Sequence, residues 1–397
     1  MNYKLSISSW DELEINAIKR VISSDQFSMG KEVLNFESMF ANKIGSNHAV
    51  MVNSGSSANL LMIASLFFVH DKSQRLKKGD EVIVPSVSWS TTYAPLQQYG
   101  LRVKFVDIDS ETLNLDLTQL KDAITNKTRA ILAVNLLGNP NDFNVIKEII
   151  KGKNILLLED NCESLGATLD YQYTGTFGLM GTFSSFFSHH ISTMEGGIIL
   201  TDNEELDHIL RCLRAHGWTR DLPNQNFVSG KKSDIYFEEA FKFCLPGYNL
   251  RPLEMSGAIG QEQLKKLNKF INVRKMNAEK FLYIIKKYPF IKTQKEIGSS
   301  SWFGFSLVLN SDSPVSRDSL VRILNQNQID CRPIVTGNFL KNKSLLEYFD
   351  YEIFGYHENA EIIDANGFFI GNHHVDLTEE LLYLDKILNK TFRDYVE

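Results

Sequence analysis

Short apolar runs alternate with amphipathic stretches along the first half of the chain. The runs rich in β-branched residues span 49–52, 81–84, 103–106, 130–134 and 155–158. Helix-like stretches separate them, and this alternation is typical of parallel strands joined by crossover helices. Two more apolar runs, at 181–187 and 197–200, extend the predicted sheet to about seven strands. The pattern therefore predicts an α/β fold with a central, mostly parallel sheet and flanking helices.

Helix signals mark both sides of this region. Ser9-Trp10-Asp11-Glu12 has the form of a capping box, which predicts an N-terminal helix. At 245–252 the pattern breaks, and a long helix-like stretch follows from about Glu254 to about Tyr288. We place a domain boundary there. Residues 1–250 would form a large domain with an N-terminal helical segment, and 251–397 a smaller C-terminal α+β domain.

Composition narrows the class of protein. The 397 residues are 43% hydrophobic and 23% charged, with a net charge of −6, as expected for a globular protein without a nucleic-acid-binding surface. The N-terminus lacks the apolar core of a signal peptide, and no apolar run is long enough to span a bilayer, so we expect a cytoplasmic protein without membrane contact. The scattered positions of Cys162, Cys212, Cys244 and Cys331 argue against an iron–sulfur cluster and predict no metal site.

Polar segments follow several predicted strands. In sheets of this kind ligands bind beyond the carboxyl ends of the strands, where 53–57, Trp89, Asp160 and His189 should meet. Segment 53–57 opens a helix-like stretch, so its hydroxyls and free amides could hold a phosphate group. A simple helix N-cap is the alternative, and it is favoured on this segment alone because Ser and Asn are ordinary caps.

The other segments each allow two interpretations. Asp160 ends a buried strand and could pair with a protonated ring nitrogen, with Glu163 nearby, or the two could belong to an acidic loop. Trp89 offers a flat surface for stacking, although a core tryptophan is the commoner case. Adjacent residues at a strand end point in different directions, so only one of His189 and His190 should face a ligand, and a shared metal ion is not expected.

Together these segments resemble the DegT-type sugar aminotransferases, which depend on pyridoxal 5′-phosphate (PLP). The agreement extends from about residue 10 to the C-terminus and includes Ser54-Gly55-Ser56-Ser57-Ala58, Asp160-x-x-Glu163-Ser164, 184–197 and Gly247-Tyr248-Asn249-Leu250-Arg251. The resemblance implies an aspartate aminotransferase-like fold of type I and a homodimer with its active site at the subunit interface. It implies cofactor contacts by Ser56, Ser57 and Ser184 and the other subunit's Asn249 with the phosphate, and by Trp89, Asp160 and Glu163 with the ring. Substrate contacts would fall on Gly30, His216, Arg220, Arg251 and Arg332.

One position departs from that family. Five residues after Ser184, where the family has a lysine, this chain has His189, although Glu195-Gly196-Gly197 closes the segment as expected. The lysine forms a Schiff base with PLP, and an imidazole cannot. The departure therefore implies that PLP and its amino form, pyridoxamine phosphate (PMP), are held without a covalent bond. It narrows the resemblance to the branch of the family that removes a sugar 3-hydroxyl group.

For that branch, the resemblance implies GDP-4-keto-6-deoxy-D-mannose as substrate and L-glutamate as amino donor. His189 would act as general base and would also protonate the departing hydroxyl. No reductase partner is expected, because the cysteines lack a cluster motif. Two alternatives stay open: an aminotransferase acting on a nucleotide-linked 4-ketosugar, and a cofactor-binding regulator without catalysis. From the residues alone the nucleotide, the sugar and the role of His190 are open as well.

Overall fold

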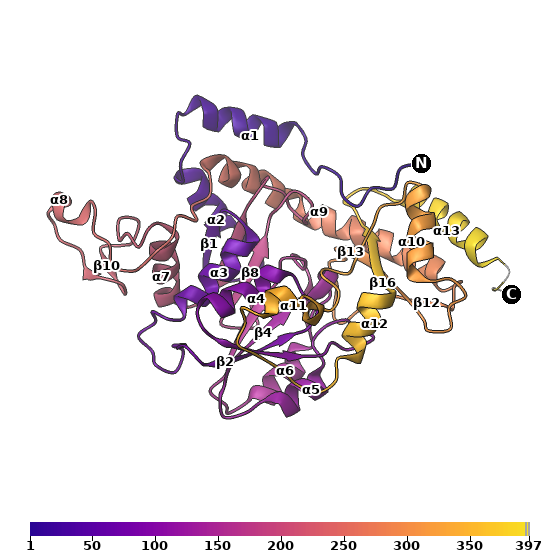
Figure 1. The fold of residues 1–397 in the computed structure, drawn as a ribbon. Helices are drawn as coiled ribbons and strands as arrows, with labels where there is room; N and C mark the ends of the chain where they lie inside the picture. The colour runs from indigo at the N-terminus through magenta and orange to yellow at the C-terminus, as the bar shows by residue number, and fades with distance from the viewer. Residues whose placement is uncertain (394, 396–397) are drawn as a thin grey trace.

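The computed structural model describes residues 1–393 and 395. An eight-stranded sheet forms its centre (Figure 1). The strand order is β1 (His48–Val52), β9 (Gly197–Thr201), β8 (Met180–Ser184), β5 (Leu156–Asp160), β4 (Thr128–Val134), β2 (Glu81–Pro85), β3 (Arg102–Val106) and β15 (Tyr351–Ile353). Neighbouring strands pair in parallel except at β9, which is antiparallel to β1 and to β8. The expected α/β architecture with a mostly parallel sheet is confirmed.

The eighth strand, β15, comes from the C-terminal part of the chain. It pairs in parallel with β3 at the edge of the sheet. Tyr351 and Glu352 are half-buried and Ile353 is exposed, so this short strand carries no apolar run of the kind that marks the others. The sequence pattern therefore accounts for every strand of this sheet except β15.

Both faces of the sheet are covered by helices, which explains why its strands are almost continuously apolar. Alternate side chains point to opposite faces, so that Val82 and Val84 pack into one core cluster and Ile83 into another. The first face is covered by α3 (Gly55–Ser65), α4 (Ser90–Gln98) and α7 (Glu204–Arg214), and the second by α5 (Leu117–Ala123) and α6 (Phe143–Ile150). Burying each such aliphatic side chain stabilises the fold by about 1.5–3 kcal/mol.

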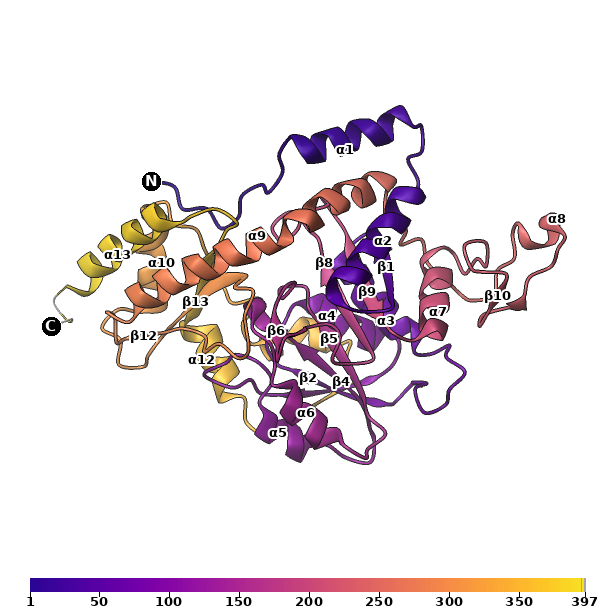
Figure 2. The same cartoon turned by 180° about the vertical axis from the view of Figure 1, so that it is seen from behind.

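The long helix α9 (Glu254–Ile285) connects the two ends of the molecule (Figure 2). Its first part packs on α1 (Glu12–Ser23) and α2 (Lys31–Ile44), and its last part on α13 (Thr378–Phe392). The helix begins where the sequence predicted and ends slightly earlier. The division into domains at residue 250 stays a prediction.

The start of α1 differs from the prediction. Asp11, not Ser9, is the N-cap, and its side chain and that of Glu14 form the capping box. The Ser9 hydroxyl instead donates to Oε1 of Gln263 on α9 at 2.7 Å. The Ser9 hydroxyl therefore makes a tertiary hydrogen bond in place of the predicted helix cap.

The C-terminal part contains a small antiparallel sheet, in agreement with the expected α+β character. Its order is β12 (Ile291–Lys292), β13 (Gly304–Leu309), β16 (Gly367–Gly371) and β14 (Cys331–Arg332). A separate apolar cluster joins this sheet to α9, α10 (Arg317–Gln326) and α13. The remaining elements are η1 (Leu136–Gly138), β6 (Thr168–Leu169), β7 (Gln172–Tyr173), β10 (Gln225–Asn226), β11 (Gly230–Lys231), α8 (Tyr236–Glu239), η2 (Phe339–Lys341), α11 (Lys343–Leu346) and α12 (Glu358–Asn366).

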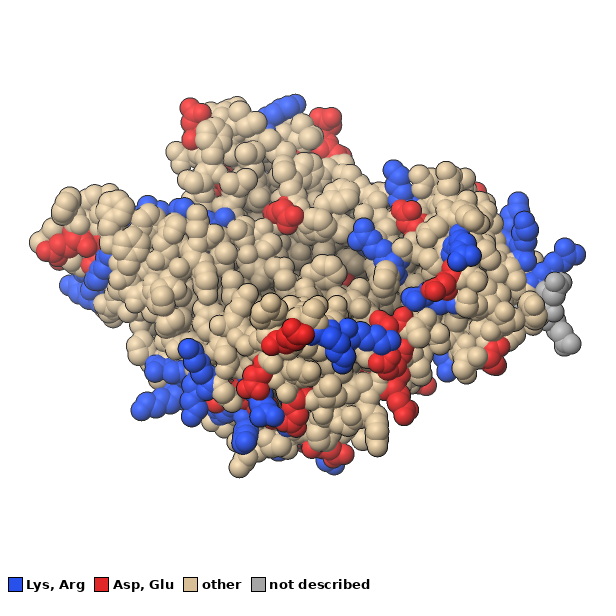
Figure 3. Space-filling model, in the orientation of Figure 1, with Lys and Arg blue, Asp and Glu red and all other residues tan. Residues whose placement is uncertain are grey.

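An arm, residues 218–243, projects from the body of the protein and carries β10, β11 and α8 (Figure 1). Figure 3 shows Lys and Arg grouped at the lower left of one face and otherwise mixed with Asp and Glu, while uncharged side chains cover most of its middle. This face therefore has no continuous basic stripe. Within the described residues, no helix combines the length and the apolar character that crossing a membrane requires.

Candidate active site

A cavity of about 360 Å³ lies beyond the carboxyl ends of the central strands. Its walls include many of the residues singled out in the sequence: Ser56, Trp89, Asp160, Glu163, Ser184, His189 and Arg332. The parallel strands β1, β2, β5 and β8 all point to this edge, and their last residues or the segments that follow them carry these side chains, except Arg332, which lies on β14. The topology thus brings residues from distant parts of the chain to one place.

The loop after β1 forms one corner of the cavity. Ser54 is the N-cap of α3, and its Oγ accepts a hydrogen bond from the Ser57 amide at 3.1 Å. The Ser56 hydroxyl lines the cavity and lies 2.8 Å from the Thr91 hydroxyl, whereas the Ser57 hydroxyl donates to Oδ1 of Asn53 at 2.6 Å. The N-cap interpretation is therefore correct for Ser54, and the same helix start opens into the cavity.

Gly55 allows this loop to approach the end of β8. A Cβ atom on Gly55 would lie 2.6 Å from the Cβ of Ser184, closer than side-chain atoms approach one another. The glycine therefore places the N-terminus of α3 beside the Ser184 hydroxyl, and both line the cavity. Helix N-termini with free amides and adjacent hydroxyls are the groups that proteins use to bind phosphate.

Asp160, the last residue of β5, is held by hydrogen bonds on both carboxylate oxygens. Its Oδ2 accepts from the side-chain amide (Nδ2) of Asn59 and from the Thr92 hydroxyl, each at 2.8 Å, and its Oδ1 accepts from the Cys162 backbone amide at 3.1 Å. The carboxylate is 4% exposed and lines the cavity. Its orientation is thus set by α3, α4 and its own strand end.

Glu163 is a second acidic wall residue with a different environment. Burial raises its pKa to about 7, the charge of Asp160 adds to this effect, and the Leu137 amide that donates to its Oε2 at 2.9 Å opposes it. A carboxyl group with a pKa near 7 exchanges protons readily at neutral pH.

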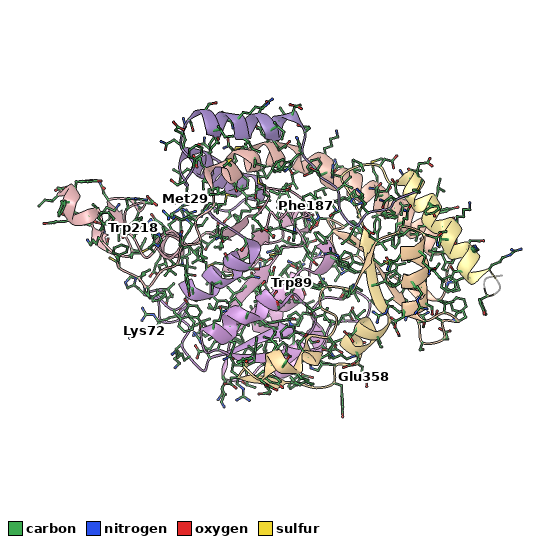
Figure 4. All side chains as sticks on the ribbon, turned by 45° about the horizontal axis from the view of Figure 1, so that its top comes forward. Met29, Lys72, Trp89, Phe187, Trp218 and Glu358 are labelled. Carbon is green, nitrogen blue, oxygen red and sulfur yellow. The ribbon has the colours of Figure 1, made fainter. Side chains whose placement is uncertain are left out.

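Trp89 lies at the mouth of the cavity. It precedes α4 as the N-cap residue and is labelled near the middle of Figure 4. Of its surface, 57% is exposed. The alternative of a core tryptophan is therefore wrong. Its indole instead offers an uncovered apolar face to a planar ligand.

The two adjacent histidines have separate environments. His189 lines the cavity between the rings of Phe186 and Phe303, at centroid distances of 5.9 and 5.2 Å. His190 is buried, and its Nε2 lies 3.1 Å from the Ser301 carbonyl oxygen. Burial lowers the pKa of His189 to about 4, and the positive charge of Arg274 acts in the same direction. His189 is therefore a neutral imidazole at physiological pH.

A family model of the DegT/DnrJ/EryC1/StrS aminotransferases matches residues 8–379. The chain belongs to this family. It is 62% identical to the GDP-4-keto-6-deoxy-D-mannose 3-dehydratase of Escherichia coli O55:H7, over 98% of this chain and 100% of that one. It is 61% identical to the enzyme of the same name from Yersinia pseudotuberculosis, over 98% and 99% of the two chains. The sequence resemblance is thereby confirmed.

Solved structures of a GDP-4-keto-6-deoxymannose 3-dehydratase have the same fold as this family member. The E. coli enzyme with bound hydrated PLP gives a TM-score of 0.96 at 62% identity, covering 98% of this chain and 99% of that chain. A structure with a trapped PLP–glutamate geminal diamine also gives 0.96 at 62% identity, covering 98% and 100% of the two chains. A variant with bound GDP-perosamine gives the same values. The aminotransferase fold is therefore established for this chain.

The groups at the cavity of this family member fit a pyridoxal cofactor. The α3 N-terminus with Ser56 and Ser184 suits its phosphate, Asp160 suits its ring nitrogen, and the exposed indole of Trp89 suits its ring face. In addition, Nδ1 of His189 is buried without a hydrogen-bond partner among the described residues, which leaves Nε2 as the ring nitrogen that can meet a ligand.

Other residues singled out in the sequence lie outside the cavity wall of the single chain. The Gly30 amide donates to Oε2 of Glu254 at 2.6 Å. The exposed Asn249 accepts from Nε of Arg251 at 3.0 Å. At the base of the arm, Arg220 lies over the Trp218 ring at 4.5 Å, and His216 packs against the same ring at 5.2 Å. Ser57 is turned towards Asn53, as described above.

Sequence reasoning missed several residues that line the cavity or hold its wall in place. Asn59 and Thr92, which hold Asp160, lie shortly after Ser56 and Trp89 in the sequence, but nothing in their spacing indicates a shared partner. Phe303 and Arg274 lie in the C-terminal half, and no motif marks them. An alignment of relatives would be the signal that could find them.

Proposed function

We propose that this protein is a PLP/PMP-dependent 3-dehydratase of nucleotide-linked deoxysugar synthesis. It removes the 3-hydroxyl group of GDP-4-keto-6-deoxy-D-mannose to give GDP-4-keto-3,6-dideoxy-D-mannose, with L-glutamate as the amino donor. The high identity to dehydratases of that name over nearly the whole chain supports this choice of reaction. So do solved relatives that hold a PLP–glutamate adduct or a GDP-linked sugar.

One observation carries the proposal. Among the described residues that line the cavity, none is a lysine, and His189 lies where the family's lysine is expected. A lysine would bind PLP covalently and would complete an amino transfer by returning its proton to the sugar. A neutral imidazole accepts a proton without capturing the aldehyde, which leaves elimination as the favoured outcome.

The cofactor would be held without a covalent bond. Ser56 and Ser184 with the start of α3 bind its phosphate, Asp160 keeps its ring nitrogen protonated, and Trp89 covers one ring face. When bound, the pyridine ring of this cofactor accepts the electrons of an adjacent carbon–hydrogen bond. Ser57 and the partner's Asn249 are assigned to the phosphate by resemblance alone.

His189 moves the protons of the reaction. Its low pKa leaves the imidazole unprotonated in the resting protein. Nε2 is therefore free to take the proton of the carbon–hydrogen bond next to the cofactor's pyridine ring. The protonated ring then lies in the same cavity as the departing 3-hydroxyl and returns the proton to it as water leaves. The electrons that expel the hydroxyl come from the broken carbon–hydrogen bond of the aminated cofactor, and L-glutamate, which is oxidised to 2-oxoglutarate, restores that form. L-Glutamate is therefore the reductant, and no separate reductase is required.

The substrate contacts extend beyond this cavity. Arg332 lines it and supplies a cation for the GDP pyrophosphate, which arginine binds through paired hydrogen bonds. Gly30, His216, Arg220 and Arg251 line no part of it in one chain, so their assignment depends on a second subunit.

A homodimer completes the proposed site. The arm exposes large apolar side chains with no cover in one chain: Phe227, Ile235, Tyr236, Phe237, Phe241 and Phe243. Tyr236 and Phe237 are 85% and 89% exposed. Exposed apolar side chains gathered in this way mark protein contact sites. A second copy of the chain is the partner, because Asn249 and Arg251 lie next to the base of the arm and are assigned to the active site.

The decisive experiment combines the protein with PLP, L-glutamate and GDP-4-keto-6-deoxy-D-mannose and weighs the sugar product. Loss of the 3-hydroxyl oxygen with release of ammonia supports the dehydratase. A GDP-amino sugar that keeps its 3-hydroxyl would identify an aminotransferase instead, and no conversion would favour a binding protein without catalysis. Sedimentation of the same protein tests the dimer, and a monomer with full activity would refute it.

A further inference from the structure

A short segment, residues 300–303, packs against the two histidines, and its last residue, Phe303, lines the cavity. Trp302 has a φ of 48°, in the left-handed region that residues with a side chain rarely adopt. Such a conformation persists only where the surroundings impose it, and it is commonest at functional sites. The segment immediately precedes β13 and ends at Phe303, whose ring lies against His189.

Arg274 on α9 holds this segment from behind. Its Nη1 donates to the carbonyl oxygens of Trp302 at 3.4 Å, Phe303 at 3.1 Å and Asn372 at 2.7 Å. The side chain is 4% exposed, and its partners in the described part of the chain are carbonyl oxygens, so its charge is not neutralised by a carboxylate. Burying a cation in this way is costly, which argues for a role beyond stability.

Hydrogen bonds through Leu137 connect residues 300–303 to Glu163 in the cavity wall. The Phe303 amide donates to the Leu137 carbonyl oxygen at 3.0 Å, and the Leu137 amide donates to Glu163. The Ser301 carbonyl oxygen lies 3.1 Å from Nε2 of His190, and the Phe303 ring packs on His190 as well as on His189. A shift of the segment would therefore move the His189 ring relative to Glu163.

We infer that Arg274 is a positioning residue for His189, which acts through residues 300–303 and the Phe303 ring to fix the imidazole at the cavity. This inference rests on the proposed function, because it assumes that His189 moves the protons of the reaction. It has an electrostatic counterpart. Burial is the main cause of the lowered pKa of His189, His190, His373 and His374, and the charge of Arg274, which disfavours a second cation nearby, acts in the same direction on all four.

The experiment compares variants that separate geometry from charge. Arg274→Lys keeps the charge but loses the planar fork, Arg274→Met loses both, and Phe303→Leu keeps the arginine but loses the ring. Lys280→Met is the matched control, because Lys280 ties the same helix to Asp376 on the protein surface. We expect kcat to fall by about tenfold or more in all three test variants, with KM for the GDP-sugar within about twofold of wild type and Lys280→Met unchanged.

A second measurement needs neither cofactor nor turnover. The rate at which diethyl pyrocarbonate modifies His189, followed by fragment mass spectrometry, reports the neutral imidazole as a function of pH. The titratable or charged groups that face His189 are His190 on its own loop, Arg274 on α9 and the wall residues Asp160, Glu163, Glu195 and Arg332. We expect the midpoint to move to higher pH in Arg274→Met and to stay near the wild-type value in Arg274→Lys.

The outcomes distinguish the inference from the proposed function. If wild-type protein dehydrates its substrate and Phe303→Leu and Arg274→Lys keep its kcat, the positioning role is wrong. If wild-type protein does not dehydrate, the proposed function fails, and a labelling midpoint unchanged in Arg274→Met then also rejects the electrostatic role. If Arg274→Met does not fold, the kcat values of Phe303→Leu and Arg274→Lys decide.

Discussion

The Thr92 hydroxyl donates a hydrogen bond to Oδ2 of Asp160 at 2.8 Å. This contact joins the start of α4 to the end of β5, and the Asn59 amide reaches the same oxygen from α3 at 2.8 Å. The carboxylate that is proposed to hold the cofactor's ring nitrogen is thereby oriented by two helices, neither of which carries it. Side chains of this kind fix the geometry of the groups that contact a cofactor.

Removal of either donor should weaken cofactor binding. Thr92→Val leaves Oδ2 of Asp160 with one partner fewer in a buried site, and a hydrogen bond to a charged group contributes about 1.5–3 kcal/mol. We expect the Kd for PMP, measured by absorbance titration, to rise by about tenfold or more. Thr174→Val is the control, because Thr174 also loses a buried hydrogen bond, to the Ser164 carbonyl, without contacting Asp160. Equal Kd values for both variants would contradict this role.

Replacement of His189 should separate binding from chemistry. His189→Asn removes the proton-transfer group, so we expect dehydration to fall by about 10²–10⁴-fold while the cofactor still binds. His189→Lys should form a covalent PLP–lysine bond, detected by mass spectrometry after borohydride reduction. His70→Asn is the control, since His70 is a surface residue paired with Glu205. A borohydride-stable adduct in the wild-type protein would rule out the non-covalent site.

The main sheet could be predicted because its strands are buried on both faces. Residues such as Ile131 and Leu158 belong to near-continuous apolar runs for that reason. The edge strand β15 lacks this constraint, as Ile353 is exposed. Helix starts were harder to predict. Ser9 and Asp11 are both residue types that cap helices, and Asp11 is the N-cap while the Ser9 hydroxyl bonds to Gln263, a contact that the local sequence does not reveal.

The residues proposed to contact a ligand were easier to predict from the sequence than the residues that hold those side chains in place. Asp160 and His189 follow strands whose ends must converge, so topology alone places them together. Thr92 and Asn59 reach Asp160 only because α3 and α4 pack on the same face of the sheet. Arg274 is far in sequence from the carbonyl groups that it contacts, such as that of Trp302. Their contact depends on the path of α9 and could not be predicted from the sequence.

The raised pKa of Glu163 should appear in the pH dependence of stability. Its folded-state pKa of about 7 lies above the ordinary value of 4.5, so the folded protein binds this proton more tightly than the unfolded chain does. The resulting stabilisation is complete below the unfolded pKa and is lost as the pH rises through about 7. Glu163→Gln has no such proton, so this contribution to the loss of stability should be missing from the variant.

Urea unfolding of the cofactor-free proteins tests this expectation. Between about pH 5 and about pH 8, the wild type should lose up to about 3 kcal/mol relative to Glu163→Gln. Burial also raises the pKa of Glu159 to about 7, but Glu159 is present in both proteins and its effect cancels. Parallel stability curves for the two proteins would show that the Glu163 proton is not linked to folding.

A buried charge cluster should support the end of the sheet next to the cavity. Glu37 on α2 is 3% exposed, and its carboxylate pairs with Arg211 at 2.7 Å and Arg214 at 2.5 Å on α7. It also accepts from the Met51 amide of β1 at 2.8 Å. Glu37→Gln would leave the buried Arg214 without an anion, whereas Arg211 would keep its pair with Asp207. The loss should destabilise the fold by about 3–5 kcal/mol.

The matched comparison for Glu37 is Glu148→Gln, which breaks the exposed pair with Lys151. Both variants remove one carboxylate charge, but the exposed side chains are surrounded by water, so Glu148→Gln should change the free energy of unfolding by less than about 1 kcal/mol. Because β1 leads directly into the start of α3, which carries Ser54 and Ser56, Glu37→Gln should also weaken PMP binding at temperatures where the protein is still folded. Urea unfolding and PMP titration of the two variants measure both effects. A similar small loss of stability in both variants would mean that the two arginines become solvated or form other ion pairs when Glu37 is neutral. The cluster would then not support the segment after β1 that is proposed to bind the cofactor.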